Sequence, residues 1–417
     1  MMANIWRIKT TEEANSELCL KEQMICIGWP PYMDDELYTT IVSEKFKFKS
    51  VESTYIDTDD EHTSMTSNIT ATSGITANSG DCNQAITLEE IEKEFIAINT
   101  YEAYEAVIAK YGLYSGPQHK GRKSSVNTFA NKMQAGDYVW LKYKSQYYVG
   151  QIRDDKLIFK YNQEQAILDD KHDYMRRYVQ RWVHMGDESK VPGAVVRAFA
   201  FRGSTVQRIV DGEAAVKAYL QFFLDRNKAE HSEFLPPYNE TNFYEEAYSY
   251  VMKLDESILE EASIYEAFKK QFFALLGTDD CEDLLCFLLY YTYGYIPWPS
   301  TNKRNMATYE CILLDPKQVG KEIYIQVKSG TSQILQPQAY EDLIALHDRN
   351  EVYLFNVSDQ YGEPSKYNQI HMIGTDEIFK DLLSKRKNGR GEILLDLVSA
   401  RIIYWLAIAY KQFVKKF

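Results

Sequence analysis

The sequence has few cysteines, and none of them stands in a C-x-x-C pair. Histidine partners at the spacing of a zinc site are also missing. We therefore interpret the cysteines as reduced thiols of a hydrophobic core and expect no structural zinc. They are Cys19, Cys26, Cys82, Cys281, Cys286 and Cys311.

The chain also lacks a long uninterrupted apolar run. Its first residues, MMANIWRIKT, hold no stretch long enough for a signal peptide or a membrane span. The apolar segment near the end, residues 394–417, is interrupted by Arg401 and closes with lysines, so we expect a core helix or a dimer helix there. These absences predict a cytoplasmic protein without a membrane partner.

The length and composition indicate several domains. With 417 residues, of which 45% are hydrophobic, the chain can bury two or three cores. We expect a multidomain protein of the α/β and α+β classes. The predicted parts are a β-rich domain over residues 1–210, a helical connector over 211–250 and an α/β domain with a mixed sheet over 251–417. Residues 57–85 are rich in Ser, Thr, Asn and Gly and predict a flexible insertion.

The first part begins with short strands and a helix. Residues 4–10 and 23–32 have the β-branched and aromatic content of strands, and prolines end the second one. Thr87 opens a helix with Glu90 three residues later, which is the spacing of a capping box. The apolar pattern continues from there to Gly112, so we expect one helix that ends at this glycine.

Three further strands are predicted in the first part, over residues 135–143, 146–152 and 173–186. The lysine-rich segment that precedes them, from about residue 115, is expected to be irregular. From 211 to 276 apolar residues recur at helical spacing, with a break at two prolines. The C-terminal part then reads as helix, two strands, helix, two strands and closing helices, which is an α/β order.

Positive charge is concentrated in one region of an acidic chain. Residues 115–210 hold 17 Lys and Arg against 9 Asp and Glu, whereas the whole chain holds 47 against 60. Such a region suits a phosphate backbone, although a solvated basic surface would give the same count. The candidate phosphate-binding residues are Lys120, Arg122, Lys123, Arg176 and Arg177.

Residues 307–330 combine two strand-like runs with polar residues that are unusual in a core. The runs ATYECILL and KEIYIQVKSG flank a polar turn, which is a hairpin signal. Because side chains alternate along a strand, Gln326 and Lys328 share one face. Glu310, on the partner run, stands among apolar residues, where a carboxylate needs a partner or a function. An acid, an amide and backbone carbonyls can hold Mg²⁺, which prefers oxygen ligands.

Each of these residues also has a structural interpretation. Glu310 and Lys328 could form a plain cross-strand ion pair on an exposed face. Glu282, on the preceding predicted helix, stands three residues after Asp279 and could only complete a capping box. Gln326 is a neutral amide, which binds Mg²⁺ less well than a carboxylate does.

The order of these segments resembles the PD-(D/E)xK nuclease superfamily, in particular its Mrr-like restriction branch, over about the last third of the chain. The resemblance assigns Glu310 and Gln326 to the two metal-site positions of that motif and Lys328 to its lysine, and it places Glu282 at the helix acid. It implies a Mg²⁺-dependent nuclease in which Glu310, the Val327 carbonyl and Glu282 hold the metal.

The N-terminal half resembles the EVE and YTH-like branch of the PUA superfamily. The matching segments, in family order, are NIWRI, ICIGWP, AGDYVWLKY with QYYVGQI, RRYVQRWV and VPGAVVRAFAFRGSTVQRI. The resemblance implies a PUA-like β-barrel that reads a flipped, modified base between aromatic side chains. Because 14% of the chain is aromatic, these side chains could equally belong to the core. The candidates are Trp29, Trp140, Tyr148 and Trp6, with Trp182 as an alternate.

Together the two resemblances imply a modification-dependent restriction endonuclease that recognises modified bases in DNA and hydrolyses the phosphodiester nearby with Mg²⁺. Cutting both strands needs two active sites, so we expect a homodimer or larger homo-oligomer. Two alternatives remain open from the sequence: an RNA-directed nuclease, and a catalytically inactive nucleic-acid-binding protein, which Gln326 favours.

Overall fold

The structure is a computed structural model. It describes residues 3–10, 13–32, 38–39, 87–114, 119, 121–161, 174–200, 203–229, 240–254, 260–298, 309–330 and 333–414. The predicted insertion at 57–85, the paired prolines at 236–237 and Lys120 lie outside the described residues.

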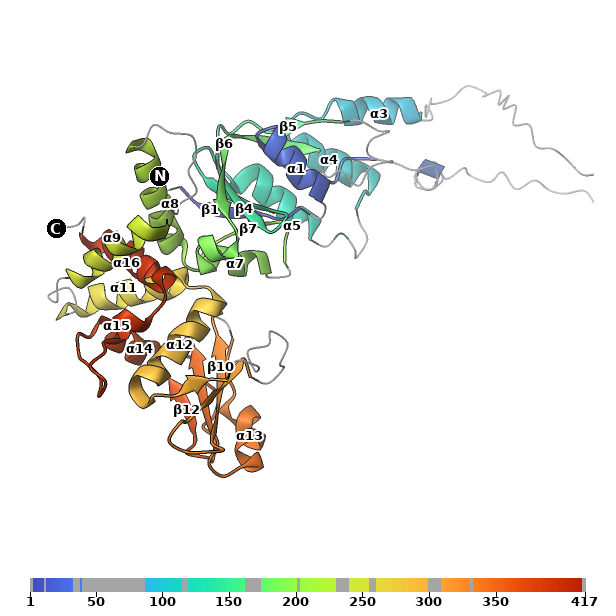
Figure 1. Cartoon of the computed structure of the whole chain (residues 1–417). Coiled ribbons are helices and arrows are strands. Elements are labelled where there is room, and N and C mark those ends of the chain that lie inside the picture. The colour runs from blue at the N-terminus through green and yellow to red at the C-terminus, as the bar shows by residue number, and fades with distance from the viewer. Residues whose placement is uncertain are drawn as a thin grey trace, which may run out of the picture. The chain divides into compact units, whose positions relative to one another are not determined.

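The chain forms two compact units, and Figure 1 shows their helices and strands. The first comprises residues 1–27, 123–156 and 176–417, and the second comprises residues 28–122 and 157–175. The fold is mixed α/β, as expected, with one curled half-barrel sheet and a second, mixed sheet. The domain borders proposed from the sequence at residues 210 and 250 remain predictions.

The half-barrel sheet contains the strands predicted in the first part of the chain and also β7, which was not predicted; the order is β2-β6-β4-β3-β1-β7. β1 runs parallel to β3 and antiparallel to β7, and β4 is antiparallel to both β3 and β6. Lys144 and Ser145 both have positive φ in the two-residue turn between β3 and β4, as the tightest hairpin turns require. The bounds are β1 Ile5–Ile8, β2 Met24–Ile27, β3 Tyr138–Tyr143, β4 Gln146–Ile152, β6 Met175–Gly186 and β7 Val206–Arg208.

Three helices accompany this sheet: α1 (Glu13–Lys21), α5 (Arg122–Asn127) and α7 (Gly193–Ala200). The segment before β3 was predicted to be irregular, and this prediction is wrong, because α5 continues into a π-helical turn over Thr128–Lys132. Arg177 stabilises that turn, since its Nε donates to the Phe129 carbonyl at 2.9 Å and its Nη2 to the Ala130 carbonyl at 2.5 Å.

The second unit contains α3 (Leu88–Ile96), α4 (Tyr101–Tyr111) and the short strand β5 (Ile158–Phe159). The predicted capping box of Thr87 and Glu90 is confirmed, and Gly112 ends α4 in the left-handed conformation, as predicted. The single helix expected between them is wrong. The first helix ends at Ile96, with Ala97 as its C-cap. The Thr100 hydroxyl then caps a new helix by accepting from the Ala103 N–H at 3.1 Å.

Four helices of the first unit pack on one another. They are α8 (Glu213–Ala229), α9 (Glu240–Met252), α11 (Ala262–Leu275) and α16 (Ala400–Val414). α16 is buried at every position from Ile402 to Tyr410, so it is a core helix. The apolar C-terminal segment is not one helix, because a short α15 (Leu394–Leu397) precedes it and the two are separated. Over the described residues no helix is both long and apolar enough to span a membrane.

The mixed sheet has the order β12-β11-β10-β9-β8. β10, β11 and β12 are parallel, and β9 and β8 continue the sheet in antiparallel pairing. α12 packs on β10 and α13 on β11, and α14 contacts α12. The bounds are α12 Thr278–Tyr293, β8 Ile296–Pro297, β9 Cys311–Leu314, β10 Glu322–Lys328, α13 Glu341–Leu346, β11 Glu351–Asn356, β12 Ile370–Ile373 and α14 Thr375–Leu383.

Two ion pairs connect the mixed sheet and α12 to neighbouring segments. Arg401, at the start of α16, pairs with the buried Asp280 of α12. At the turn before β10, the buried Lys321 ammonium donates to Glu351 Oε1 at 2.8 Å and to the Tyr295 hydroxyl at 3.2 Å. These contacts connect α12, the loop after it, β10 and β11.

Candidate functional site

The β9–β10 hairpin has the two faces that the sequence predicted. Ile323, Ile325 and Val327 belong to the main hydrophobic core, whereas Tyr324 belongs to a smaller cluster on the opposite face. Gln326 and Lys328 therefore lie on the side of Tyr324. The Glu310 N–H donates to the Ile325 carbonyl at 2.7 Å and extends the pairing by one residue beyond β9.

This pairing brings Glu310 next to both polar side chains of β10. Gln326 Nε2 donates to Glu310 Oε1 at 2.5 Å, and Lys328 Nζ lies 3.8 Å from the same oxygen. The Lys328 side chain is 36% exposed and that of Glu310 is 25% exposed, while Gln326 is buried. A surface ion pair would be more exposed, so the plain cross-strand interpretation fits these burials poorly.

Glu282 lies in the second turn of α12 and does not cap that helix. The N-terminal cap is provided by Asp280, whose Oδ2 accepts from the Gly277 N–H at 2.9 Å. Burial raises the pKa of Glu282 to about 7, and the nearby Glu310 carboxylate adds to this increase. The Glu310 carboxylate therefore disfavours the ionised form of Glu282, as a neighbouring like charge does.

The oxygen atoms at the hairpin are ligands of the type that Mg²⁺ prefers, although few of them come from side chains. The Gln326 amide nitrogen contacts both Glu310 Oε1, at 2.5 Å, and the Val327 carbonyl, at 3.2 Å. Two of the three predicted ligands, the Glu310 carboxylate and the Val327 carbonyl, thus lie around one position. In this structure the amide nitrogen of Gln326 occupies that position. Within the described part of the chain, no group of three His, Cys, Asp or Glu could hold a metal. The donor set fits an ion that keeps much of its water, as Mg²⁺ does.

The hairpin residues line a cavity of about 590 Å³ together with residues from the N-terminal half. Glu310, Val327 and Lys328 contribute from the mixed sheet. The opposite lining includes Arg197 of α7 and Arg208 of β7. The sequence interpretation missed both arginines, and the only local signal for Arg197 was a charged residue within the apolar helix GAVVRAFA.

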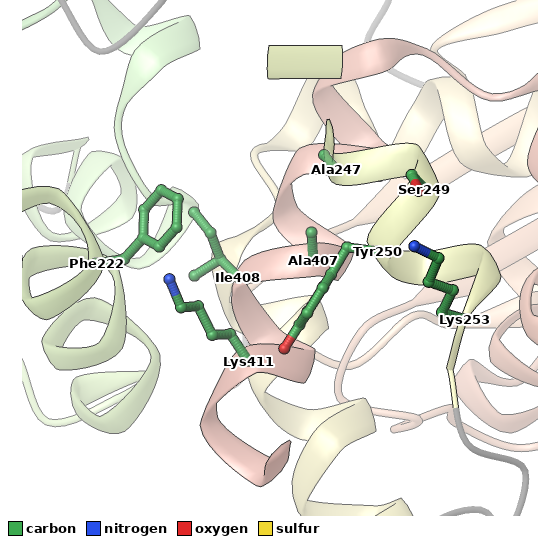
Figure 2. A pocket seen from close by; sticks show the side chains of 8 residues that line it. All are labelled: Phe222, Ala247, Ser249, Tyr250, Lys253, Ala407, Ile408 and Lys411. Atoms are coloured by element: carbon green, nitrogen blue, oxygen red, sulfur yellow. The ribbon is translucent and has the colours of Figure 1, made fainter. Parts of the chain in front are cut away.

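A second cavity, of about 280 Å³, lies among α8, α9 and α16 (Figure 2). Its walls are apolar, and Lys411 Nζ lies 4.3 Å from the centre of the Phe222 ring. Lys253, one residue after the end of α9 at Met252, also lines the cavity. Among the described residues that line it there is no carboxylate, histidine or cysteine.

The predicted base-binding aromatics are not gathered at one place. Trp140 and Trp6 are buried within the half-barrel, and Trp6 Nε1 donates to Asp137 Oδ2 at 2.7 Å. Trp182 is also buried and donates to the Cys19 carbonyl at 2.9 Å. For these three, the core interpretation that the sequence left open fits the structure better than an accessible stacking face.

The two remaining aromatics are more accessible. Tyr148 is half-buried, and its ring centre lies 5.1 Å from that of His184 on β6. Trp29 belongs to the second unit, is half-buried and has a φ of 66°, which is rare for a bulky residue. Its carbonyl accepts from the Tyr104 hydroxyl at 2.9 Å. Backbone strain of this kind is concentrated at functional sites, which keeps Trp29 as the principal candidate.

Two of the predicted phosphate-binding arginines are engaged elsewhere. Arg122 is buried and pairs with Glu105 at 2.8 Å, and Arg177 is buried against the π-helical turn. Both predictions are corrected, because these guanidinium groups do not face solvent. Lys123 is exposed and Arg176 is half-buried, and they remain candidates.

Comparisons of the chain with models of protein families, with curated proteins and with solved structures found no match.

Proposed function

We propose that this protein is a Mg²⁺-dependent endonuclease that cuts DNA carrying modified bases. The observation that supports the proposal most is the contact of Gln326 and Lys328 with Glu310 at the edge of a cavity, beside the elevated pKa of Glu282. In this proposal the mixed sheet belongs to a restriction-endonuclease-like domain of the Mrr branch, and the half-barrel belongs to a PUA-like domain that reads the base.

Each side chain has a distinct role in the proposed reaction. Glu310 and the Val327 carbonyl would hold Mg²⁺, and Glu282 would bind it directly or through water. Mg²⁺ supplies charge neutralisation at the phosphate when it is bound. Lys328 orients the attacking water, assists its deprotonation and stabilises the negative charge that develops on the phosphate. Gln326 orients a water molecule next to Glu310.

The proposal is tested by cleavage of matched DNA. Duplexes of one sequence would be prepared with unmodified, methylated and hypermodified bases and incubated with the full chain in Mg²⁺ or in EDTA. Cutting confined to modified DNA and to Mg²⁺ is the expected result. Equal cutting of all duplexes would contradict base reading, and cutting in EDTA would contradict the metal role.

A catalytically inactive nucleic-acid-binding protein is the second candidate, and Gln326 favours it. Its amide stands where the nuclease motif has an acid and donates to two of the proposed metal ligands. Retained DNA binding without cleavage of any substrate would support this candidate. Competition between modified duplex DNA and structured RNA, measured in the same assay, separates DNA from RNA as the ligand.

Replacing Trp29 by alanine is expected to remove the preference for modified DNA. Stacking of a base on an aromatic face contributes about 1–3 kcal/mol, which corresponds to roughly a 5- to 150-fold loss of affinity. The measurement is the ratio of dissociation constants for modified and unmodified duplexes. Trp298→Ala is the matched control, because Trp298 is 39% exposed and lies at the end of β8. An unchanged ratio in Trp29→Ala would place the reading pocket elsewhere.

A further inference from the structure

Arg197 lines the cavity of the candidate site but comes from the other half of the first unit. It lies on α7, which follows the long strand β6 of the half-barrel, whereas Glu310 and Lys328 lie at the mixed sheet. The site is therefore composite, because its walls come from segments more than 100 residues apart in the sequence.

The Arg197 side chain is half-buried, and its guanidinium is only partly satisfied. Its Nη1 donates to the Leu276 carbonyl at 3.0 Å and its Nη2 to the Ala274 carbonyl at 3.3 Å, both at the end of α11. Its Nε has no hydrogen-bond partner. Asp211, which also lines the cavity, influences it through charge but is not paired with it. A guanidinium carries five N–H donors, so several remain available.

The other cations of this cavity each have a carboxylate neighbour. Arg208 Nη2 donates to Glu213 Oε2 at 2.8 Å, and Lys328 lies 3.8 Å from Glu310. Burial lowers the pKa of Arg197 despite the opposing charge of Asp211, which means that the charged form is held at a cost. Such a cost is offset when an anion binds. The planar fork of arginine suits phosphate, to which it can donate two parallel hydrogen bonds.

We propose that Arg197 is a phosphate-binding residue, which holds one substrate phosphate in the cavity beside Glu310 and Lys328. This inference rests on the proposed nuclease function and gives the substrate side of the same site. The cavity volume of about 590 Å³ lies in the range of small-ligand pockets, about 300–1,000 Å³. It therefore suits a nucleotide-sized part of one strand. Because α7 follows β6, the half-barrel would contribute directly to cleavage.

The test is binding of a small phosphate ligand without metal. The full chain would be titrated calorimetrically with a 5′-phosphorylated thymidine dinucleotide in EDTA, as wild type, Arg197→Lys, Arg197→Gln and the control Arg386→Gln. Arg386 is exposed in the loop between α14 and α15 and does not line the cavity. We expect about tenfold weaker binding or more for Arg197→Gln, a smaller loss for Arg197→Lys and no change for Arg386→Gln.

A purely structural role of Arg197 at the end of α11 predicts a different result. Both Arg197 variants would then unfold at lower temperature but bind the dinucleotide as wild type does, and this outcome would overturn the proposal. If neither variant folds, crystals of the wild type soaked in tungstate decide, because the anomalous peak should lie at the Arg197 guanidinium. A soak without that peak counts against the site.

The outcomes separate this inference from the nuclease proposal. Arg197-dependent dinucleotide binding in a protein that cuts no DNA would leave the phosphate site standing without the nuclease function. Cleavage of modified DNA by the Arg197→Gln variant at the wild-type rate would instead overturn the phosphate site and leave the nuclease function standing.

Discussion

Replacing Lys328 by alanine is expected to reduce DNA cleavage by about 100- to 1,000-fold, which is the usual effect of removing one group that stabilises developing charge. Folding should persist, because the ammonium is partly exposed and its removal leaves only Glu310 without an ion-pair partner. Gln326 still donates to that carboxylate. DNA binding should also persist, since the proposed base-reading and phosphate-binding residues are unchanged in this variant.

Single-turnover cleavage, thermal unfolding and electrophoretic mobility shift together check this prediction. Lys366→Ala is the matched control, because Lys366 also pairs with one glutamate, Glu341 at 3.4 Å, but does not line the cavity. Wild-type cleavage by Lys328→Ala would mean that Lys328 has no catalytic role. Loss of cleavage together with loss of folding would assign Lys328 a structural role only.

Replacing Gly193 by alanine is expected to destabilise the first unit by about 3 kcal/mol or more, as overpacking against a part that cannot move does. A Cβ at this position would lie 1.8 Å from the Leu276 carbonyl oxygen and 2.8 Å from the Gly277 nitrogen. These atoms are backbone, so no side chain can rotate away. Gly277 precedes α12, which carries Glu282, so movement here would also disturb the candidate site.

Urea unfolding measured by circular dichroism checks this second prediction. Gly389→Ala is the control, because nothing lies within 4 Å of a Cβ there and its φ is not in the left-handed region. We expect that control to stay within about 0.5 kcal/mol of wild type. Equal midpoints for Gly193→Ala and wild type would show that α7 can shift away from the end of α11.

Local features were predictable from the sequence. The capping box at Thr87, the helix end at Gly112 and the face shared by Gln326 and Lys328 follow from signals within a few residues. The hairpin that carries Glu310 was also predictable, because strand alternation and turn chemistry act over short distances. These signals were sufficient to predict that Glu310, Gln326 and Lys328 lie close together.

Long-range partners were not predictable. A count of basic residues cannot reveal that Arg122 is neutralised by Glu105, seventeen positions earlier. Nor does the apolar pattern of strand β3 distinguish a stacking platform from a core residue, and Trp140 is in the core. The composite character of the cavity depends on the approach of α7 to the end of α11. That approach requires a glycine, but a single glycine in a sequence has many possible reasons.

The buried Lys321 at the turn before β10 has a consequence for the site at the other end of that strand. Side chains alternate, so sliding β10 by one residue along β11 would move Gln326 and Lys328 into the hydrophobic core and Ile325 and Val327 out of it. Lys321 reaches Glu351 only in the observed alignment, in which Ile323 lies opposite Glu351. Loss of this contact would leave the buried Lys321 ammonium with Asp315, at 3.9 Å, as its remaining carboxylate neighbour, which is unfavourable for a charge out of water. The pair of Lys321 and Glu351 has no part in the proposed chemistry. It nevertheless fixes the strand register that places Gln326 and Lys328 beside Glu310.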